Sequence, residues 1–190
     1  MSNVKASQEK LIRLGYGEYM RPYGADGKLG PKTKKATLEF QKDYNKKTKK
    51  RIKEDGIPGP ETNKALDHWM KEAGKWGTKH YSINEFRCKG TGKLPSGGMD
   101  NQLLLKLEEL RYRLGGKPVI INSGYRTPEH NRKVGGAANS QHLYGRAADI
   151  VVKGVSPSRV YQEADKLFNG VGKYPTFTHV DTRPGKKVRF

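Results

Sequence analysis

The stretch that decides the fold and chemistry of this chain is residues 140–149, which read SQHLYGRAAD. It places His142 and Asp149 on either side of Gly145, a residue that favours a turn over a continuous helix. The pattern therefore predicts a loop histidine that folds back onto a strand aspartate. Asp149 opens the apolar run 150–152, where an unpaired carboxylate would be costly, and a bound cation is one way to satisfy it.

A second short stretch, residues 178–181, contains another histidine and another aspartate. On a strand, alternate side chains share a face, so His179 and Asp181 point one way and Val180 points the other. Two histidines and one carboxylate, with one position left open, form a ligand set typical of catalytic zinc. The two stretches together predict a metal site.

The surrounding sequence predicts a mixed architecture in the second part of the chain. An amphipathic helix is expected over 102–114, because leucines recur there at helical spacing. These elements do not alternate regularly, which favours an α+β fold over a parallel α/β fold. Further expected elements are strands at 118–122, 147–152 and 177–181 and a helix at 157–168.

The first third of the chain contains an internal repeat. Residues 26–33, DGKLGPKT, recur as DGIPGPET at 55–62, and each copy predicts a turn followed by a helix start. With an earlier helix at about 4–14, the pattern predicts a small bundle of three helices. We expect a bundle domain at 1–74, a linker at 75–80 and an α+β domain at 81–190.

The composition bounds the possible functions. The chain has 190 residues and a formal net charge of +19, which implies a polyanionic partner such as nucleic acid, an anionic membrane or a wall polymer. Its one cysteine, Cys88, excludes an intrachain disulfide framework and a cysteine-based zinc finger. Neither an apolar run long enough to span a membrane nor a signal-peptide pattern is seen, and no nucleic-acid-binding signature stands out.

The repeat region resembles the family of peptidoglycan-binding domains over about residues 3–73. The resemblance includes the two turns and the pair Phe40-Gln41, and it implies wall anchoring without chemistry. The chain departs from the family pattern in an insertion at 18–23 and in a lysine-rich run at 46–53. The repeated Asp and Gly are expected to form turns rather than to contact sugars, and a generic three-helix packing unit is the alternative.

Residues 123–126, SGYR, the motif Ser-x-His-x-x-Gly-x-Ala-x-Asp at 140–149 and His-x-Asp at 179–181 stand in an order that resembles the M15 peptidases. This family contains zinc D-Ala-D-Ala carboxypeptidases and L-alanyl-D-glutamate endopeptidases, and the resemblance covers about 80–183. It implies a fold of the hedgehog/DD-peptidase type, with His142, Asp149 and His179 as the zinc ligands.

The same resemblance implies roles for two further residues. Arg126 matches the arginine of the family, whose planar fork suits a carboxylate or carbonyl of the substrate. The general base does not carry over, because Thr176 and Phe177 occupy the positions where other members place an acid or a histidine. Asp181 is then the nearest candidate base, or else it orients His179 or pairs with Arg183.

These patterns predict zinc-dependent hydrolysis of peptide bonds in the stem peptides of bacterial peptidoglycan, with an N-terminal wall anchor. We expect an endolysin-like, bacteriolytic monomer that stays in the host cytoplasm until it is released to the wall. The alternative is a non-catalytic wall-binding protein with a structural zinc site. A basic nucleic-acid binder is a weaker rival, because the two motif sets are specific.

Overall fold

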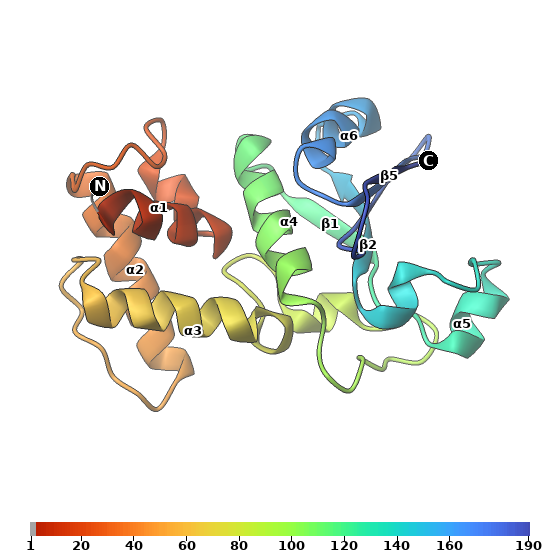
Figure 1. Cartoon of the computed structure of the whole chain (residues 1–190), viewed down its shortest axis with the longest axis horizontal. Helices are drawn as coiled ribbons and strands as arrows, with labels where there is room; N and C mark the ends of the chain where they lie inside the picture. Colours follow the sequence, from red (N-terminus) through yellow and green to blue (C-terminus); the bar gives the residue numbers. More distant parts are fainter. Residues whose placement is uncertain (1–2) are drawn as a thin grey trace.

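The computed structural model describes residues 3–190, so the first two residues of the expected bundle domain lie outside it. Within this range the chain forms three N-terminal helices, followed by three further helices and a five-stranded sheet (Figure 1). The predicted α+β class is confirmed. None of the helices in these residues has the length and apolar composition needed to cross a bilayer. The α-helices are α1 Asn3–Arg13, α2 Pro31–Lys47, α3 Pro60–Trp76, α4 Asn101–Arg113, α5 Pro128–Lys133 and α6 Pro157–Asp165.

The two copies of the repeat start α2 and α3 in the same way. Gly30 and Gly59 stand in extended conformation just before each helix, and a proline occupies the first turn, where its missing N–H costs nothing. Each helix then buries one apolar stripe, with Phe40 at the centre of an aromatic cluster that includes Tyr16 and Trp69. The aromatic cluster is the core of the bundle.

The second copy of the repeat closes around one buried glutamine. Gln41 Nε2 donates to Asp55 Oδ1 at 3.1 Å and to Thr62 Oγ1 at 3.0 Å. Its Oε1 accepts from the backbone N–H of Gly56 at 2.8 Å. The side chain is fully buried, so its amide group depends on these partners.

The first copy is built in the same way around Gln8. Its Nε2 donates to Asp26 Oδ1 at 2.9 Å and to Thr33 Oγ1 at 2.8 Å, and its Oε1 accepts from Gly27 N at 2.7 Å. The repeated Asp, Gly and Thr therefore hold the turns, in agreement with the predicted turn-forming role. The central glutamines lie outside the repeated octapeptides, one on α1 and one on α2.

The sheet has the strand order β1-β2-β4-β3-β5 and is antiparallel except for the β3–β5 pair. The three predicted strands are present, while β3 and β5 were not expected from the sequence. Both are short, and β3 contains two glycines that give little strand signal. The strands are β1 Val119–Ser123, β2 Ala147–Val152, β3 Gly170–Lys173, β4 Thr178–Asp181 and β5 Val188–Arg189.

The register of β2 against β4 separates the core from the polar face of the sheet. Ala148 pairs with Val180, and both are fully buried in the hydrophobic core. Asp149 pairs with His179, and because side chains alternate along a strand, these two project from the opposite face. The sheet thus places the predicted metal-binding side chains on the face turned away from the hydrophobic core.

Helix α4 joins the two parts of the chain, since it packs against α1 and α3 on one side and α6 on the other (Figure 1). Its Glu108 is almost completely buried and accepts hydrogen bonds from Thr78 Oγ1 at 2.7 Å and from His80 N at 2.8 Å. Gly15 approaches this carboxylate with φ +99°, and any Cβ there would lie 2.7 Å from Glu108 Oε1.

The segment expected as a linker, 75–80, is held on both sides. Its first two residues form the end of α3, which runs to Trp76. Lys79 then donates to Asp43 Oδ2 on α2 at 2.7 Å, while His80 Nδ1 lies 2.9 Å from Glu108 Oε2 on α4. Hydrogen bonds therefore tie this segment to both the bundle and the sheet-containing part.

Replacing Gln41 with alanine should lower the free energy of unfolding by about 2–4 kcal/mol, because it leaves buried groups of the second turn without partners. Urea unfolding followed by circular dichroism measures the loss. The matched control is Gln162→Ala on the exposed side of α6, with an expected change within about 0.5 kcal/mol. Equal losses for the two variants would contradict the role assigned to the buried glutamine.

Candidate metal centre

His142 lies in the short 3-10 helix η3, Gln141–Tyr144, directly before the turn that leads into β2. Its Nδ1 donates to the carbonyl of Gly124 at 2.6 Å, which orients the ring and turns Nε2 toward the strand aspartate. That Nε2 lies 3.3 Å from Asp149 Oδ1. The loop histidine therefore folds back onto the strand aspartate, as the sequence predicts.

His179 reaches the same carboxylate oxygen from the neighbouring strand. Its Nδ1 lies 2.9 Å from Asp149 Oδ1, and its Nε2 lies 3.1 Å from Asp181 Oδ2. Burial alone would lower the pKa of His179, but the two carboxylates outweigh it and raise the pKa above its usual value. A cation and a proton would therefore compete for Nδ1.

These three donors have the spacing of a metal site. The ligand atoms of His142, Asp149 and His179 all lie within 4.8 Å of one another, and all three residues are buried. A tetrahedral site with bonds of about 2.0–2.1 Å has edges of roughly 3.3 Å, close to the 3.3 Å and 2.9 Å separations given above. Two neutral imidazoles and one carboxylate suit zinc, so the residues fit the ion.

Arg126 holds the other oxygen of the central carboxylate. Its Nη2 donates to Asp149 Oδ2 at 2.6 Å, and its Nε donates to Ser123 Oγ at 3.0 Å. An irregularity in β1 between Ile121 and Ser123 brings Ser123 opposite Asp149 and turns this segment toward the site. Burial would raise the pKa of Asp149, but hydrogen bonds with His142 and His179 hold it well below its usual range.

Asp181 lies behind His179, fully buried. Arg183 donates to it through Nε, at 2.8 Å to Oδ1, and also through Nη2 and its backbone N–H. Burial would raise the pKa of Asp181, but the hydrogen bonds with Arg183 and His179 keep it far below the ordinary value. Gly170 makes room for this carboxylate, since a Cβ there would lie 2.0 Å from Oδ2. Of the roles left open by the sequence, these contacts favour the orientation of His179 together with the pairing with Arg183.

The three candidate ligands open into a cleft of about 570 Å³. One wall consists of Tyr174 and Phe177, whose stacked rings have centroids 4.3 Å apart, together with Phe190, whose ring centroid lies 5.3 Å from that of His179. The other wall is the loop 134–141. Among the described residues that line this cleft, Asp149 has the one acidic side chain.

Sequence reasoning missed several of these features. The carbonyl of Gly124 gives no sequence signal, because any residue supplies a carbonyl. The aromatic wall was missed because Tyr174 and Phe190 reach the cleft only through the pairing of β3 with β4 and β5. The pairing of Asp181 with Arg183, in contrast, was one of the alternatives that the sequence left open.

Comparisons with known proteins agree with this geometry. Residues 79–181 match the family described as Peptidase M15, and residues 1–66 match the family described as a putative peptidoglycan binding domain. The first match covers more than half of the chain, which therefore belongs to the peptidase M15 family.

Individual relatives match between 53% and 78% of this chain. A zinc D-Ala-D-Ala carboxypeptidase of Streptomyces albus G is 33% identical over 157 residues, 78% of this chain and 58% of that protein. The peptidoglycan L,D-endopeptidase MepK of Escherichia coli K12 is 34% identical over 110 residues, 53% of this chain and 59% of that protein. A probable N-acetylmuramoyl-L-alanine amidase of Bacillus licheniformis is 32% identical over 151 residues, 78% of this chain and 39% of that protein. The chain thus spans less than two thirds of each relative.

The hydrogen bonds that Asp181 makes with His179 and Arg183 predict that the stability of the protein falls at acidic pH. A carboxyl whose pKa is lowered by folding contributes stability that is complete above its unfolded pKa, about 3.9, and is lost as the pH falls through the folded pKa. The free energy of unfolding of the metal-free protein, prepared with a chelator, should therefore decrease as the pH falls below about 5. In Asp181→Asn this drop should be shallower, because one such carboxyl is gone.

Urea unfolding at several pH values between 5 and 3, about the range in which the unfolded carboxyl begins to bind protons, measures the slope. Asp67→Asn, at an exposed aspartate paired with Lys10, is the control and should keep the parent slope. An Asp181→Asn protein with the parent slope would show that the contacts with His179 and Arg183 do not stabilise the ionised form of Asp181.

Proposed function

We propose that this chain hydrolyses peptide bonds in the stem peptides of bacterial peptidoglycan with a zinc ion held by His142, Asp149 and His179. The observation that carries the proposal is the convergence of these three donors at the floor of a cleft. The family, and the zinc peptidase and peptidoglycan endopeptidase among its relatives, support both the ion and the substrate.

When bound, zinc lowers the pKa of a coordinated water to about 7 and polarises a carbonyl oxygen. The protein supplies the geometry for that chemistry. The Gly124 carbonyl orients His142, and Asp181 orients His179 through Nε2, so each imidazole presents its other nitrogen to the ion. Arg126 keeps Oδ2 of Asp149 occupied and leaves Oδ1 for the ion.

Arg126 also lines the cleft, where it can bind a carbonyl or carboxylate of the substrate with the donors that Asp149 and Ser123 do not use. The stacked rings of Tyr174 and Phe177 also line the cleft and offer an apolar surface to the short side chains of a stem peptide. These residues define how a peptide would lie across the three donors.

The N-terminal bundle, with the segment 75–80 as its boundary, is proposed to anchor the chain to the wall. The match of residues 1–66 to a peptidoglycan-binding family supports this role. The net charge of +19 adds attraction to anionic wall polymers. Action as a monomer belongs to the proposal as well, since one copy of the chain supplies all three donors. The proposal includes release of the chain from the host cytoplasm to the wall, as in an endolysin.

One observation favours the alternative of a wall-binding protein with a structural zinc site. Asp181 is tied to Arg183 and His179, and Asp149 has the one acidic side chain that lines the cleft in the described part of the chain. The described residues that line the cleft therefore offer no acidic side chain for the role of general base besides the candidate ligand Asp149. The following experiment separates the two functions.

Purified peptidoglycan incubated with the protein should release new fragments that mass spectrometry detects, and a chelator should abolish the release until zinc is restored. Free D-Ala would identify a carboxypeptidase, whereas a new amino terminus on D-Glu or a cut cross-bridge would identify an endopeptidase. His142→Ala should lose both zinc retention, measured by elemental analysis, and product release. Zinc retained without any product from the unaltered chain would favour the structural-zinc alternative.

The positioning role of Asp181 has its own test. Asp181→Asn should weaken zinc binding about 10- to 100-fold, because His179 loses the partner that orients it. Competition with a chromophoric chelator measures the affinity. Asp67→Asn, the same acid-to-amide change at an exposed position of the bundle, is the control and should bind zinc like the parent. Unchanged affinity with a collapsed turnover would instead identify Asp181 as the general base.

A further inference from the structure

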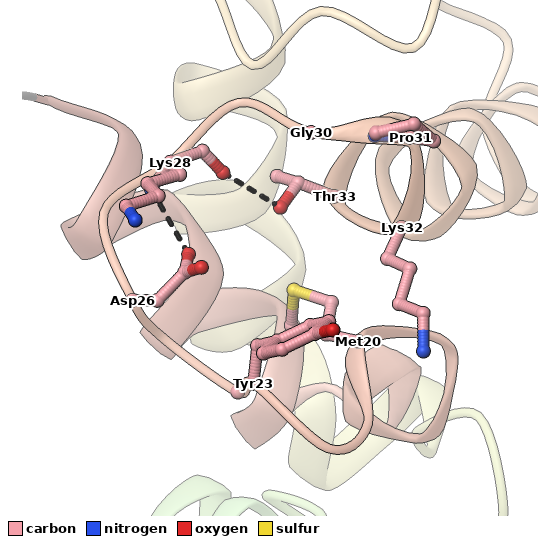
Figure 2. Close-up of a pocket in the computed structure, with 9 residues that line it drawn as sticks. Met20, Tyr23, Asp26, Lys28, Gly30, Pro31, Lys32 and Thr33 are labelled. Atoms are coloured by element: carbon pink, nitrogen blue, oxygen red, sulfur yellow. Dashed lines mark hydrogen bonds between the residues drawn. The ribbon is translucent and has the colours of Figure 1, made fainter.

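The bundle contains a pocket of about 390 Å³ at the start of α2, separate from the metal centre (Figure 2). It lies between the first copy of the repeat and the segment that precedes it. The face that carries the pocket mixes an aromatic ring with two lysines and one carboxylate. The lining residues are Met20, Tyr23, Gly24, Asp26, Lys28, Gly30, Pro31, Lys32 and Thr33.

The internal repeat shows which of these residues the turn needs. Both copies keep the Asp, Gly and Thr that bind the central glutamine. The lysines of the first copy are not kept, since Ile57 stands at the position of Lys28 and Glu61 at that of Lys32. The second turn folds with the same hydrogen bonds without them, so Lys28 and Lys32 are not required by the turn.

The opposite wall comes from the insertion that sets this chain apart from the family pattern. Within this insertion, Met20 is buried, while the side chain of Tyr23 is 68% exposed. Lys32 donates to the carbonyl of Arg21 and holds its Nζ 5.2 Å from the centre of the Tyr23 ring. An exposed aromatic face and a positioned ammonium group thus stand side by side at the pocket, as Figure 2 shows.

The carboxylate of Asp26 completes the set of polar groups. Its Oδ1 accepts from Gln8 and from the backbone N–H of Lys28, which leaves Oδ2 to accept from a ligand. Two lysines and one aspartate give the pocket a net charge of +1, which complements a single carboxylate better than a phosphate polymer of higher charge. Hydroxyl or amide N–H groups on the ligand would suit Asp26.

We propose that this pocket binds a muramyl-peptide unit of peptidoglycan. The apolar face of the amino sugar packs on Tyr23, its N–H or hydroxyl groups donate to Asp26, and a stem-peptide carboxylate pairs with Lys32. This inference rests on the proposed wall anchoring and specifies the residues and the part of the wall polymer involved.

The test measures binding of the full chain to purified sacculi stripped of teichoic acid, by co-sedimentation in the presence of a chelator. Tyr23→Ala should weaken binding about tenfold, as expected for loss of an aromatic anchor. Lys32→Glu, which installs the residue of the second copy, should weaken it about fivefold through loss of one ionic contact. Tyr23→Phe should retain binding, and muramyl dipeptide should compete with the sacculi.

The matched control is Lys49→Glu, which changes the net charge equally at an exposed lysine in the loop after α2. It should stay within about twofold of the parent, as a solvated charge far from a contact does. Thermal unfolding of each variant checks that the bundle remains folded.

Three results would overturn the proposal. Unchanged binding by Tyr23→Ala and Lys32→Glu would show that the pocket is not used. An equal loss in Lys49→Glu would reduce the effect to general charge attraction. A loss confined to walls that carry teichoic acid would assign the pocket to a phosphate polymer. Because binding is measured without zinc, a chain that binds sacculi but releases no fragments would defeat the proposed hydrolysis and leave the pocket standing.

Discussion

The buried carboxylate of Asp149 is the constraint on which the rest of the peptidase part depends. It is only 7% exposed, and three basic side chains from three different segments converge on its two oxygens. A charge removed from water needs such partners, because an unpaired carboxylate in this position would cost several kcal/mol. The η3 turn, the irregular end of β1 and the β2–β4 register are therefore three ways of bringing one partner each to the same carboxylate.

The sequence carried most of this site because its signals are local. Residues 140–149 and 179–181 contain the three candidate ligands, and strand alternation alone places His179 and Asp181 on one face. What could not be predicted depends on contacts between distant segments. Gln8 and Gln41 hold turns that are distant from them in the sequence. A glutamine in a helical segment gives no sequence signal of its hydrogen-bond partners. The short strand β3 and the aromatic wall of the cleft likewise exist only through pairing with distant strands.

The duplicated turn distinguishes structural residues from ligand-binding candidates within one chain. The Asp, Gly and Thr residues common to both copies hydrogen-bond the buried glutamines. The side chains that differ between the copies are not needed for these hydrogen bonds. The second copy is thus an internal reference for the first. It also explains why the Asp and Gly that dominate the repeat are structural, whereas the lysines beside them are open to selection for a partner.

The joint at Glu108 has a consequence for how the chain would work on an extended lattice. Hydrogen bonds on both sides of residues 75–80 leave little freedom between the bundle and the cleft. A flexible tether would let a catalytic unit reach every bond within the length of the tether. A stiff joint instead fixes the distance between the bundle and the metal centre. If the bundle anchors to a sugar as proposed, the fixed spacing between that sugar and the metal centre would limit the stem peptides that the cleft can reach to those at a matching distance in the lattice.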